Sequence, residues 1–380
     1  MKSILYIHDF SFKFNKLDLY TAVGMPEEYF NRFLDSGFNK VYLCTRLNHY
    51  ALNDNSGFEK INNKNIEHIF KTPIQYTSLI KFQNLRKIAK TIIETDLLVI
   101  NYPTLISIPI LLLKYLLRPS LPYVCEVAAD NDQFNTKKLG NIITFFFKLI
   151  SKSIIKNASG AIYVNNFLKN KYANKNSIVA SNVNIEKVIK RDYEHLHGEM
   201  KETLILSFAG GLNERKGLDT ILKTIKLLVD LKEFKKLELH IMGGHSDRNW
   251  IQIAKSYGVN DYVKFHGILN KHEMESIFKL SHIYLQPSLT EGLPRSTIEA
   301  MSFGLPVIAT NIPAFRDLIA THFLVPQKDH IAIKNIIIEM RLNKDKYIEN
   351  CNKNEETASR FLYSELQNKR VEFYSQYTKI

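Results

Sequence analysis

The feature that most constrains the fold of this chain is the alternation of short apolar segments with helical ones along nearly all of its 380 residues. Strands separated by helices are joined by parallel crossovers and build a doubly wound α/β sheet. In the first half, strands are expected at 4–7, 41–45, 97–100, 123–127 and 161–164. Helices are expected near 26–36, 82–95, 104–117, 136–157 and 166–172.

The second half repeats this pattern after a polar stretch near 184–202 that keeps no apolar period. We interpret that stretch as a linker, because one hydrophobic core rarely serves a chain of this length. The expected strands are 204–208, 237–242, 263–265, 283–286, 306–309 and 323–325, and the expected helices begin at 217 and lie near 249–257, 328–341 and 344–379. The sequence thus predicts two Rossmann-like domains, 1–185 and 203–360, facing a central cleft, and a C-terminal helix at 361–380 that packs back toward the first domain.

The composition of the chain limits the classes of binding partner but does not identify one. The net charge of +13 suits nucleic acid, an anionic membrane or a phosphorylated substrate, or it reflects a lysine-rich proteome. No basic-aromatic recognition motif accompanies it, so we expect no nucleic acid partner. The three cysteines are far apart and odd in number, which fits a reducing cytoplasm or plain core packing. No apolar run is long enough to span a bilayer, so a soluble or peripheral protein is expected.

The strongest local signal is EGLPRSTIEAMSFGLPVIAT at 291–310, directly after an expected strand. Pro294 suits the first turn of a helix, and Gly292 allows the backbone to approach a ligand closely. The free N–H groups of a helix N-terminus can bind a diphosphate. Carboxylates beside phosphate would be repelled unless they face hydroxyl groups, so Glu291 and Glu299 indicate sugar and ribose recognition. A lone pair of this spacing would more simply be an acidic helix cap, but loop, helix and following strand agree here.

This segment resembles the donor-site signature of the family 4 (group 1) glycosyltransferases of the bacterial surface-polysaccharide type. The resemblance implies a GT-B fold, in which Glu291 holds hydroxyls of the transferred sugar and Glu299 binds the ribose of the nucleotide. It also implies that the amides of Gly292 and Leu293 meet phosphate and sugar oxygens.

The second signal is FAGGLNERKG at 208–217, where a strand ends in two glycines before a polar loop and a helix. Such a loop can cradle phosphates with its amides, and Lys216 would stabilise the charge of a diphosphate leaving group. The segment resembles the family's G-R-L-x-x-x-K-G loop at Gly210, Leu212, Lys216 and Gly217. Gly211 replaces the usual Arg. Either Arg215 reaches the phosphates from a neighbouring position, or another residue compensates.

Several weaker sequence signals resemble other parts of the same family's site. Gly243 and Gly244 end a strand where the family has a glycine turn at the nucleotide, and HGIL at 266–269 resembles the segment that recognises the base. In the first domain, Gly24 stands where the family has a double glycine. Asp130, in EVAADND, lies nearest to the place of a usual His; it either orients an acceptor hydroxyl or is a plain turn residue.

The resemblance implies a retaining hexosyltransferase that moves a sugar from a UDP- or GDP-linked donor to a glycan or lipid-linked acceptor, in capsule or O-antigen synthesis. No cofactor and no metal ion are expected, because no Asp-x-Asp motif accompanies the donor signature. Residues 137–157 combine five lysines with apolar side chains, so they either lie on the inner face of an anionic membrane or pack against the core. The alternative function is a non-catalytic nucleotide-sugar-binding scaffold of a polysaccharide assembly complex. A nicotinamide enzyme is not expected, since no G-x-G-x-x-G follows the first strand.

Overall fold

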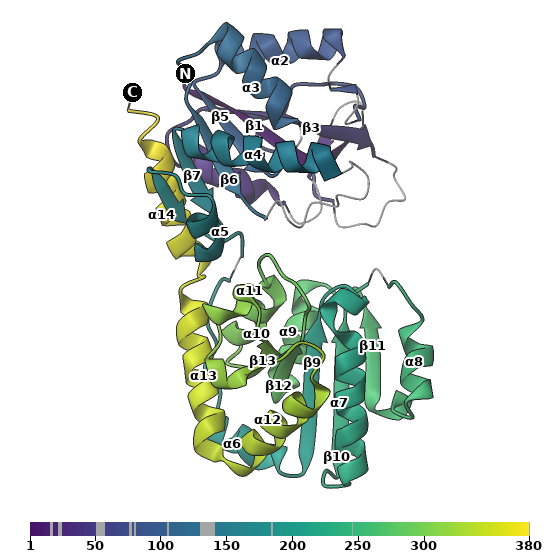
Figure 1. Ribbon diagram of the computed structural model, residues 1–380. Helices are drawn as coiled ribbons and strands as arrows, with labels where there is room; N and C mark the ends of the chain where they lie inside the picture. Colours follow the sequence, from purple (N-terminus) through teal and green to yellow (C-terminus); the bar gives the residue numbers. More distant parts are fainter. Residues whose placement is uncertain are drawn as a thin grey trace. The chain divides into compact units, whose positions relative to one another are not determined.

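The computed structural model describes residues 1–15, 18–21, 25–50, 58–75, 78–79, 81–104, 106–129, 141–183, 185–244 and 246–379, with side chains of α4 from residue 149 onward. The chain divides into two compact units (Figure 1). Unit 1 is Met1–Asn182 together with Leu366–Ile380, and unit 2 is Val183–Glu365.

Unit 1 is built on a sheet in the order β4-β3-β1-β5-β6-β7-β8, to which β2 adds an antiparallel partner of β1. All other pairings between the named strands of this sheet are parallel, as the alternation of the sequence predicts. The strands of the described residues are β1 (Ser3–Asn15), β2 (Asp18–Tyr20), β3 (Lys40–His49), β4 (Ile66–His68), β5 (Leu97–Tyr102), β6 (Tyr123–Val127), β7 (Gly160–Tyr163) and β8 (Ser177–Val179).

The helices of unit 1 cover both faces of this sheet. They are η1 (Glu27–Phe30), α1 (Asn31–Leu34), α2 (Phe82–Glu94), α3 (Ser107–Leu117), α4 (Asn141–Asn157), α5 (Asn166–Lys171) and α14 (Tyr363–Ser375). Helices α2, α3 and α4 each join strands in the direction from β4 toward β8, so right-handed crossovers place them on one face. On the other face α14 packs against α1, with the rings of Tyr374 and Phe33 4.9 Å apart.

A buried ion pair lies in the core of unit 1. Glu126 of β6 accepts hydrogen bonds from the hydroxyls of Tyr29, at 2.6 Å, and Tyr374, at 2.8 Å. Arg32 of α1 donates to the same carboxylate at 3.3 Å, and both charged side chains are almost fully buried. Burial alone would raise the pKa of Glu126, but Arg32 and the two hydroxyls outweigh it and lower that pKa. The pair therefore ties β6, α1 and α14 together.

Unit 2 holds a parallel sheet in the order β11-β10-β9-β12-β13-β14. Its strands are β9 (Thr203–Ala209), β10 (Lys236–Met242), β11 (Val263–Gly267), β12 (Ile283–Gln286), β13 (Val307–Thr310) and β14 (Leu324–Val325). Its helices are α6 (Tyr193–Met200), η5 (Glu214–Lys216), α7 (Leu218–Leu231), α8 (Trp250–Ser256), η6 (Asn260–Tyr262), α9 (Lys271–Leu280), α10 (Arg295–Ser302), α11 (Pro313–Arg316), η7 (Thr321–Phe323), α12 (His330–Leu342) and α13 (Lys344–Ser359). Helices α7 and α8 lie in crossovers that lead from β9 toward β11, whereas α9 and α10 lie in crossovers that lead the other way, toward β13. Because crossovers are right-handed, the two pairs of helices cover opposite faces of the sheet (Figure 1).

Two expectations about the chain's organisation were wrong. The stretch 184–202 is part of unit 2 rather than a linker, because Ile185 and Met200 belong to its hydrophobic core and α6 forms there. The closing helix is also not continuous: α13 ends at Ser359 and α14 begins at Tyr363. Between them the backbone pairs with Ile185 through a parallel bridge at Leu362, and Tyr363 N donates to Ile185 O at 2.7 Å. That pairing interrupts the helix just before the chain returns to unit 1 at Leu366.

Candidate functional site

The strand order of unit 2 reverses between β9 and β12, because β10 and β11 lie on one side of β9 and β12 to β14 on the other. In an open parallel sheet, the loops that leave two such strands separate and form a crevice at their carboxyl ends. The loop after β9 carries the expected phosphate-binding residues, and the loop after β12 begins the expected donor signature. The fold therefore places both signals at one switch point.

An ion pair joins these two loops. The ammonium of Lys216 lies 2.6 Å from Glu291 Oε1, with side-chain exposures of 15% and 5%. Ser288 donates to the same carboxylate oxygen at 2.7 Å. Lys216 ends η5, whose start is capped by the side chain of Asn213. Gly217 follows with φ +80°, and a Cβ there would lie 2.1 Å from the carbonyl of Pro287, so this close approach of the two loops requires glycine.

Arg215 lies at the edge of this pair. Its guanidinium donates to the carbonyl of Thr290 at 2.7 Å and is 3.9 Å from the nearer oxygen of Glu291. The side chain is half exposed, unlike that of Lys216. Arg215 is thus close to the Lys216–Glu291 pair, as required if it replaces the Arg missing at Gly211.

A second feature, which could not be predicted from the sequence, is a buried tyrosine near these loops. The hydroxyl of Tyr284 on β12 accepts from the amide of Ala209 at 3.2 Å and lies 3.0 Å from the hydroxyl of Ser296 in α10. Ser296 in turn donates to Ala209 O at 2.8 Å. Burial raises the pKa of Tyr284, and the negative charges of Glu299 and Glu291 raise it further. Tyr284 therefore stays neutral and fixes α10 to the end of β9.

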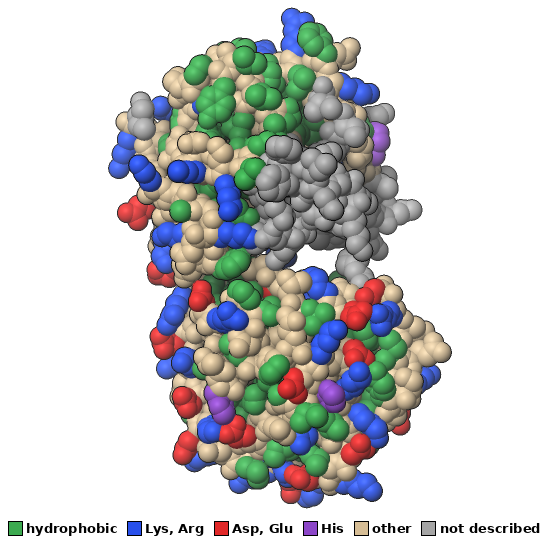
Figure 2. Space-filling model, in the orientation of Figure 1, with side chains coloured by type: hydrophobic (Ala, Val, Ile, Leu, Met, Phe, Trp, Pro, Cys, Tyr) green, Lys and Arg blue, Asp and Glu red, His purple; other side chains and the backbone are tan. Residues whose placement is uncertain are grey.

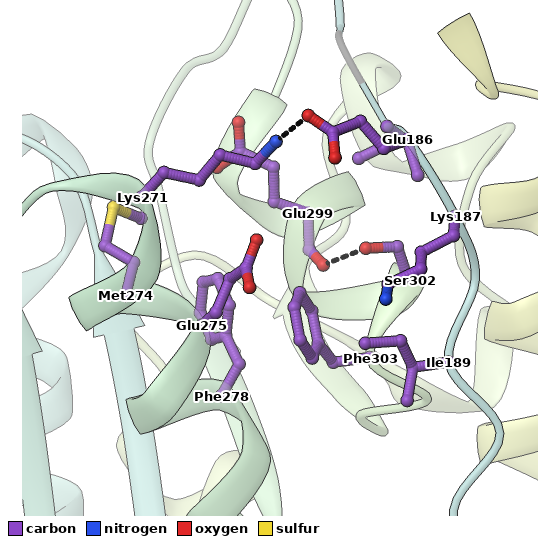
Figure 3. A pocket seen from close by; sticks show the side chains of 11 residues that line it. Glu186, Lys187, Ile189, Lys271, Met274, Glu275, Phe278, Glu299, Ser302 and Phe303 are labelled. Atoms are coloured by element: carbon purple, nitrogen blue, oxygen red, sulfur yellow. Dashed lines mark hydrogen bonds and ion pairs between the residues drawn. The ribbon is translucent and has the colours of Figure 1, made fainter. Parts of the chain in front are cut away.

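Glu299 lines a cavity of about 330 Å³ within unit 2 (Figure 3). Helix α9 contributes Lys271, Met274, Glu275 and Phe278, helix α10 contributes Glu299, Ser302 and Phe303, and the segment before α6 contributes Ile185, Glu186, Lys187 and Ile189. Lys271 extends across the opening to an ion pair with Glu186, as Figure 3 shows. Burial raises the pKa of Glu299, and nearby Arg295 and Lys271 offset only part of that effect. A carboxylate in such a place is suited to accept hydrogen bonds from the hydroxyl groups of a ligand.

The glycine turns at the ends of β9, β10 and β11 are held together by their backbones. Gly210 N donates to Met242 O at 2.9 Å, and Gly243 N donates to Gly267 O at 2.7 Å. Gly243 has φ +140°, and a Cβ on it would lie 1.9 Å from Gly210 O. The amides of Gly210 and Gly243 are thus used within the protein, whereas those of Gly211 and Gly244 have no partner among the described residues.

The remaining expected site residues are placed as follows. Gly292 and Leu293 lie in the loop before α10, and Leu293 packs partly on the core of unit 2. Pro294 is the N-cap rather than a residue of the first turn, and no side chain caps the helix there. Gly24 and Asp130 lie outside the described residues, so their expected roles stay predictions. Among the residues that the structure describes, no group of three or more His, Cys, Asp or Glu could hold a metal ion.

The chain is similar to known glycosyltransferases. Residues 190–358 match the family model described as Glycosyl transferases group 1. Protein CapJ of Staphylococcus aureus is 28% identical over 386 residues, which cover 99% of this chain and 96% of CapJ. The O-antigen biosynthesis glycosyltransferase WclY of Escherichia coli is 30% identical over 115 residues, which cover 30% of this chain and 31% of WclY.

Solved structures share the whole fold. Sucrose-phosphate synthase from Thermosynechococcus elongatus has a TM-score of 0.68 at 16% identity and covers 100% of both chains. The Anabaena protein Alr3699/HepE in complex with UDP has a TM-score of 0.67 at 14% identity, covering 99% of this chain and 100% of its own. At these identities the likeness is one of fold.

The doubly wound fold of both units, as predicted from the sequence, is confirmed as that of the GT-B glycosyltransferases. The protein is a glycosyltransferase. Its residues 190–358 are similar to the group 1 glycosyltransferases.

Proposed function

We propose that this glycosyltransferase transfers a sugar from a UDP- or GDP-linked donor to a glycan or lipid-linked acceptor, with retention of anomeric configuration and without a metal ion. The observation that carries the proposal is the pairing of Lys216 with Glu291 across the switch point of the unit 2 sheet. Glu299 lies eight positions further on, in the helix that begins beside this pair.

The pair accounts for a carboxylate at a diphosphate site. An isolated Glu291 would repel the donor's phosphates, but its charge is balanced by the ammonium of Lys216 at 2.6 Å. An ammonium has three donors, so Lys216 can keep Glu291 in place and still donate to a phosphate oxygen. Glu291 would then face the hydroxyls of the sugar.

This arrangement supports the proposed reaction. When the glycosidic bond breaks, negative charge grows on the departing diphosphate, and Lys216 with the uncapped N-terminus of α10 would stabilise it. The acceptor hydroxyl would attack on the same face and give its proton to the departing phosphate, which gives retention. Glu299 would bind the ribose hydroxyls and so fix the donor's position. The protein's contribution is positioning and charge.

Activity in EDTA is a direct test of metal independence. Because Lys216 would supply the positive charge at the phosphates, we expect transfer to proceed at the same rate in EDTA. Loss of activity in EDTA, restored by Mg²⁺ or Mn²⁺, would show that a metal ion supplies that charge instead.

The pathway is inferred from relatives. WclY is an O-antigen biosynthesis glycosyltransferase by its name, and CapJ aligns with this chain from end to end. We infer a role in capsule or O-antigen assembly, on the cytoplasmic side of the membrane.

If the acceptor is lipid-linked, the enzyme works at a membrane surface. Residues 137–157 stay the sequence-based prediction for that contact; in the described part of α4, Leu149 and Ile150 are exposed beside Lys152. No helix among the described residues is long and apolar enough to cross a membrane.

The deciding experiment combines binding with turnover. A thermal-shift series with UDP, GDP and their sugars should show selective stabilisation by one nucleotide class. The purified protein should also hydrolyse that donor slowly, and Glu291→Gln should lose hydrolysis while keeping its melting temperature. Asp230→Asn is the matched control: Asp230 also pairs with a lysine, Lys226 at 2.7 Å, but at the far end of α7. Donor binding without any hydrolysis or transfer would favour the alternative, a non-catalytic scaffold.

A further inference from the structure

Helix α3 of unit 1 has an unusual outward face. Its sequence, SIPILLLKYLL, contains one charged residue, Lys114, and that side chain is turned inward. Lys114 is 3% exposed and donates to the carbonyl of Pro119 at 2.6 Å. A surface helix normally presents polar side chains outward, and a helix that is apolar all round is normally covered on all sides. Here one side of such a helix is open.

The open side is formed by four neighbouring side chains, which we call the α3 face: Leu112, Tyr115, Leu116 and Leu117. They are 60%, 48%, 79% and 41% exposed. Arg118 joins the end of α3 to the end of α2 by donating to Ile93 O at 2.9 Å, and Ile93 is itself exposed. Figure 2 shows hydrophobic side chains gathered over this part of unit 1. A contiguous exposed patch of this kind marks an interaction site.

The charges around the α3 face are nearly all positive. Helices α2, α3 and α4 together contain seven Lys or Arg residues and one acidic residue, Glu94. On α2, Arg86, Lys87 and Lys90 are exposed, and on α4 Lys152 and Lys156 are exposed. These helices lie on the same face of the sheet, so the apolar side chains of α3 are flanked by cations from both neighbours.

We propose that the α3 face inserts its leucines and Tyr115 into the surface of an anionic lipid bilayer. Apolar side chains flanked by lysine and arginine suit a layer whose hydrocarbon lies beneath negative headgroups, and tyrosine is favoured at that boundary. A second copy of this chain fits less well, because two such faces in contact would bring like charges together. The proposal concerns α3, which the sequence did not mark as a membrane contact, and it does not depend on the donor site.

The test is sedimentation of the full chain with vesicles of phosphatidylcholine, with and without phosphatidylglycerol. The protein should pellet with the anionic vesicles and be released by high salt. Leu112→Gln with Leu116→Gln should weaken this binding roughly tenfold for each leucine removed, from the transfer free energy of an apolar side chain. Lys87→Glu with Lys90→Glu should also weaken it and should reduce its dependence on salt.

Three controls keep the result unambiguous. Both leucines are exposed, so the double variant should keep its melting temperature and its hydrolysis of the donor in solution. Ile331→Gln with Leu342→Gln removes two exposed apolar side chains of unit 2 and should not change pelleting. Glu291→Gln should pellet like the unmodified chain, which separates this proposal from the proposed transfer.

Two outcomes would overturn the proposal. One is equal pelleting by the leucine variant and the unmodified chain. The other is a concentration-dependent dimer in light scattering that the leucine variant abolishes, since the α3 face would then bind a second copy.

Discussion

Each unit of this molecule contains a carboxylate paired with a cation, and the two pairs differ in their surroundings. In unit 1, Glu126 and Arg32 have side-chain exposures of 4% and 5%, and two tyrosine hydroxyls complete the carboxylate's hydrogen bonds. In unit 2, Glu291 is equally buried, but its partner Lys216 keeps 15% of its surface at the end of a sheet where the strand order reverses. Burial of the carboxylate is therefore not what distinguishes them.

The two pairs differ in their cation and in its position in the fold. The groups around the Glu126–Arg32 pair belong to the core of one unit, so its role is to hold β6, α1 and α14 together. Lys216 lies in a loop that follows a strand, where open α/β sheets bind ligands. We therefore interpret the pair of unit 2, whose cation lies at the carboxyl edge of the sheet, as part of a ligand site, and the enclosed pair of unit 1 as structural.

The largest effect is expected on stability, from breaking the pair of unit 1. Glu126→Ala leaves the buried Arg32 uncompensated and should lower the free energy of unfolding of unit 1 by about 3–5 kcal/mol. Because the pKa of Glu126 is lowered below its ordinary value of 4.5, its contribution is complete above that value and is lost as the pH falls through the folded-state pKa. Urea denaturation as a function of pH measures both. If Glu291→Ala costs as much stability as Glu126→Ala, the distinction between the pairs is wrong.

The next effect is on catalysis, from removing the cation of unit 2. Lys216→Ala should reduce kcat for donor hydrolysis about 100- to 1,000-fold, the usual cost of one charge-stabilising group. Lys216→Arg should recover part of the rate, since it restores the charge but changes the geometry. Lys226→Ala, which removes an exposed lysine paired with Asp230, is the control. An unchanged kcat in Lys216→Ala would place the leaving group elsewhere.

The local sequence was enough to select three candidate residues of the unit 2 site. Glu291, Lys216 and Glu299 lie in loop-to-helix segments whose glycines and prolines are informative by themselves. Tyr284 and Ser288 could not be predicted this way. They lie in and just after a parallel strand that is buried on both faces, where polar and apolar positions do not alternate. Their partners come from β9 and α10 and from the loop itself, so their roles depend on tertiary contacts.

The prediction that residues 184–202 form a linker was wrong for a similar reason. Residues 184–202 contain few apolar side chains at a regular period, yet Ile185 pairs with Leu362 in a bridge and His197 contacts Met340 O at 3.1 Å. Contacts between residues so far apart in the sequence leave no local pattern. The Glu126–Arg32 pair was missed for the same reason, although its strand was predicted correctly.

A smaller effect concerns Glu299, whose pKa shift has the opposite sign to that of Glu126. Its raised pKa means that the folded protein prefers the protonated form, so its contribution to stability is present at low pH and is lost as the pH rises through the folded-state pKa. Nucleotide affinity should change in the other direction, because a protonated carboxyl accepts hydrogen bonds poorly. We expect Glu299→Gln to weaken nucleotide binding about tenfold at neutral pH, the loss of a charged hydrogen bond.

Calorimetric titration across pH separates these effects. The affinity of the unmodified chain should fall toward acid pH, and that of Glu299→Gln should be flat. Glu275→Gln lines the same cavity and is the control for its electrostatics. A pH dependence that persists in Glu299→Gln would assign the titration to another group.

The smallest expected effect decides whether Arg215 replaces the Arg that Gly211 lacks. Arg215 is half exposed and 3.9 Å from Glu291, so its ion pair contributes little to stability, about 1 kcal/mol or less. If it contacts the donor phosphates, Arg215→Ala should raise KM for the donor about three- to tenfold with an unchanged melting temperature, as for one exposed charged contact. Gly211→Arg in that background should restore KM. Gly211 does not have a positive φ, and a Cβ there would lie 2.9 Å from the side chain of Asn213, which can shift, and 3.9 Å from Gly244 O, an ordinary van der Waals contact. Recovery would show that either position can supply the second cation beside Lys216, whereas an unchanged KM in Arg215→Ala would leave Lys216 as the cation that the phosphates need.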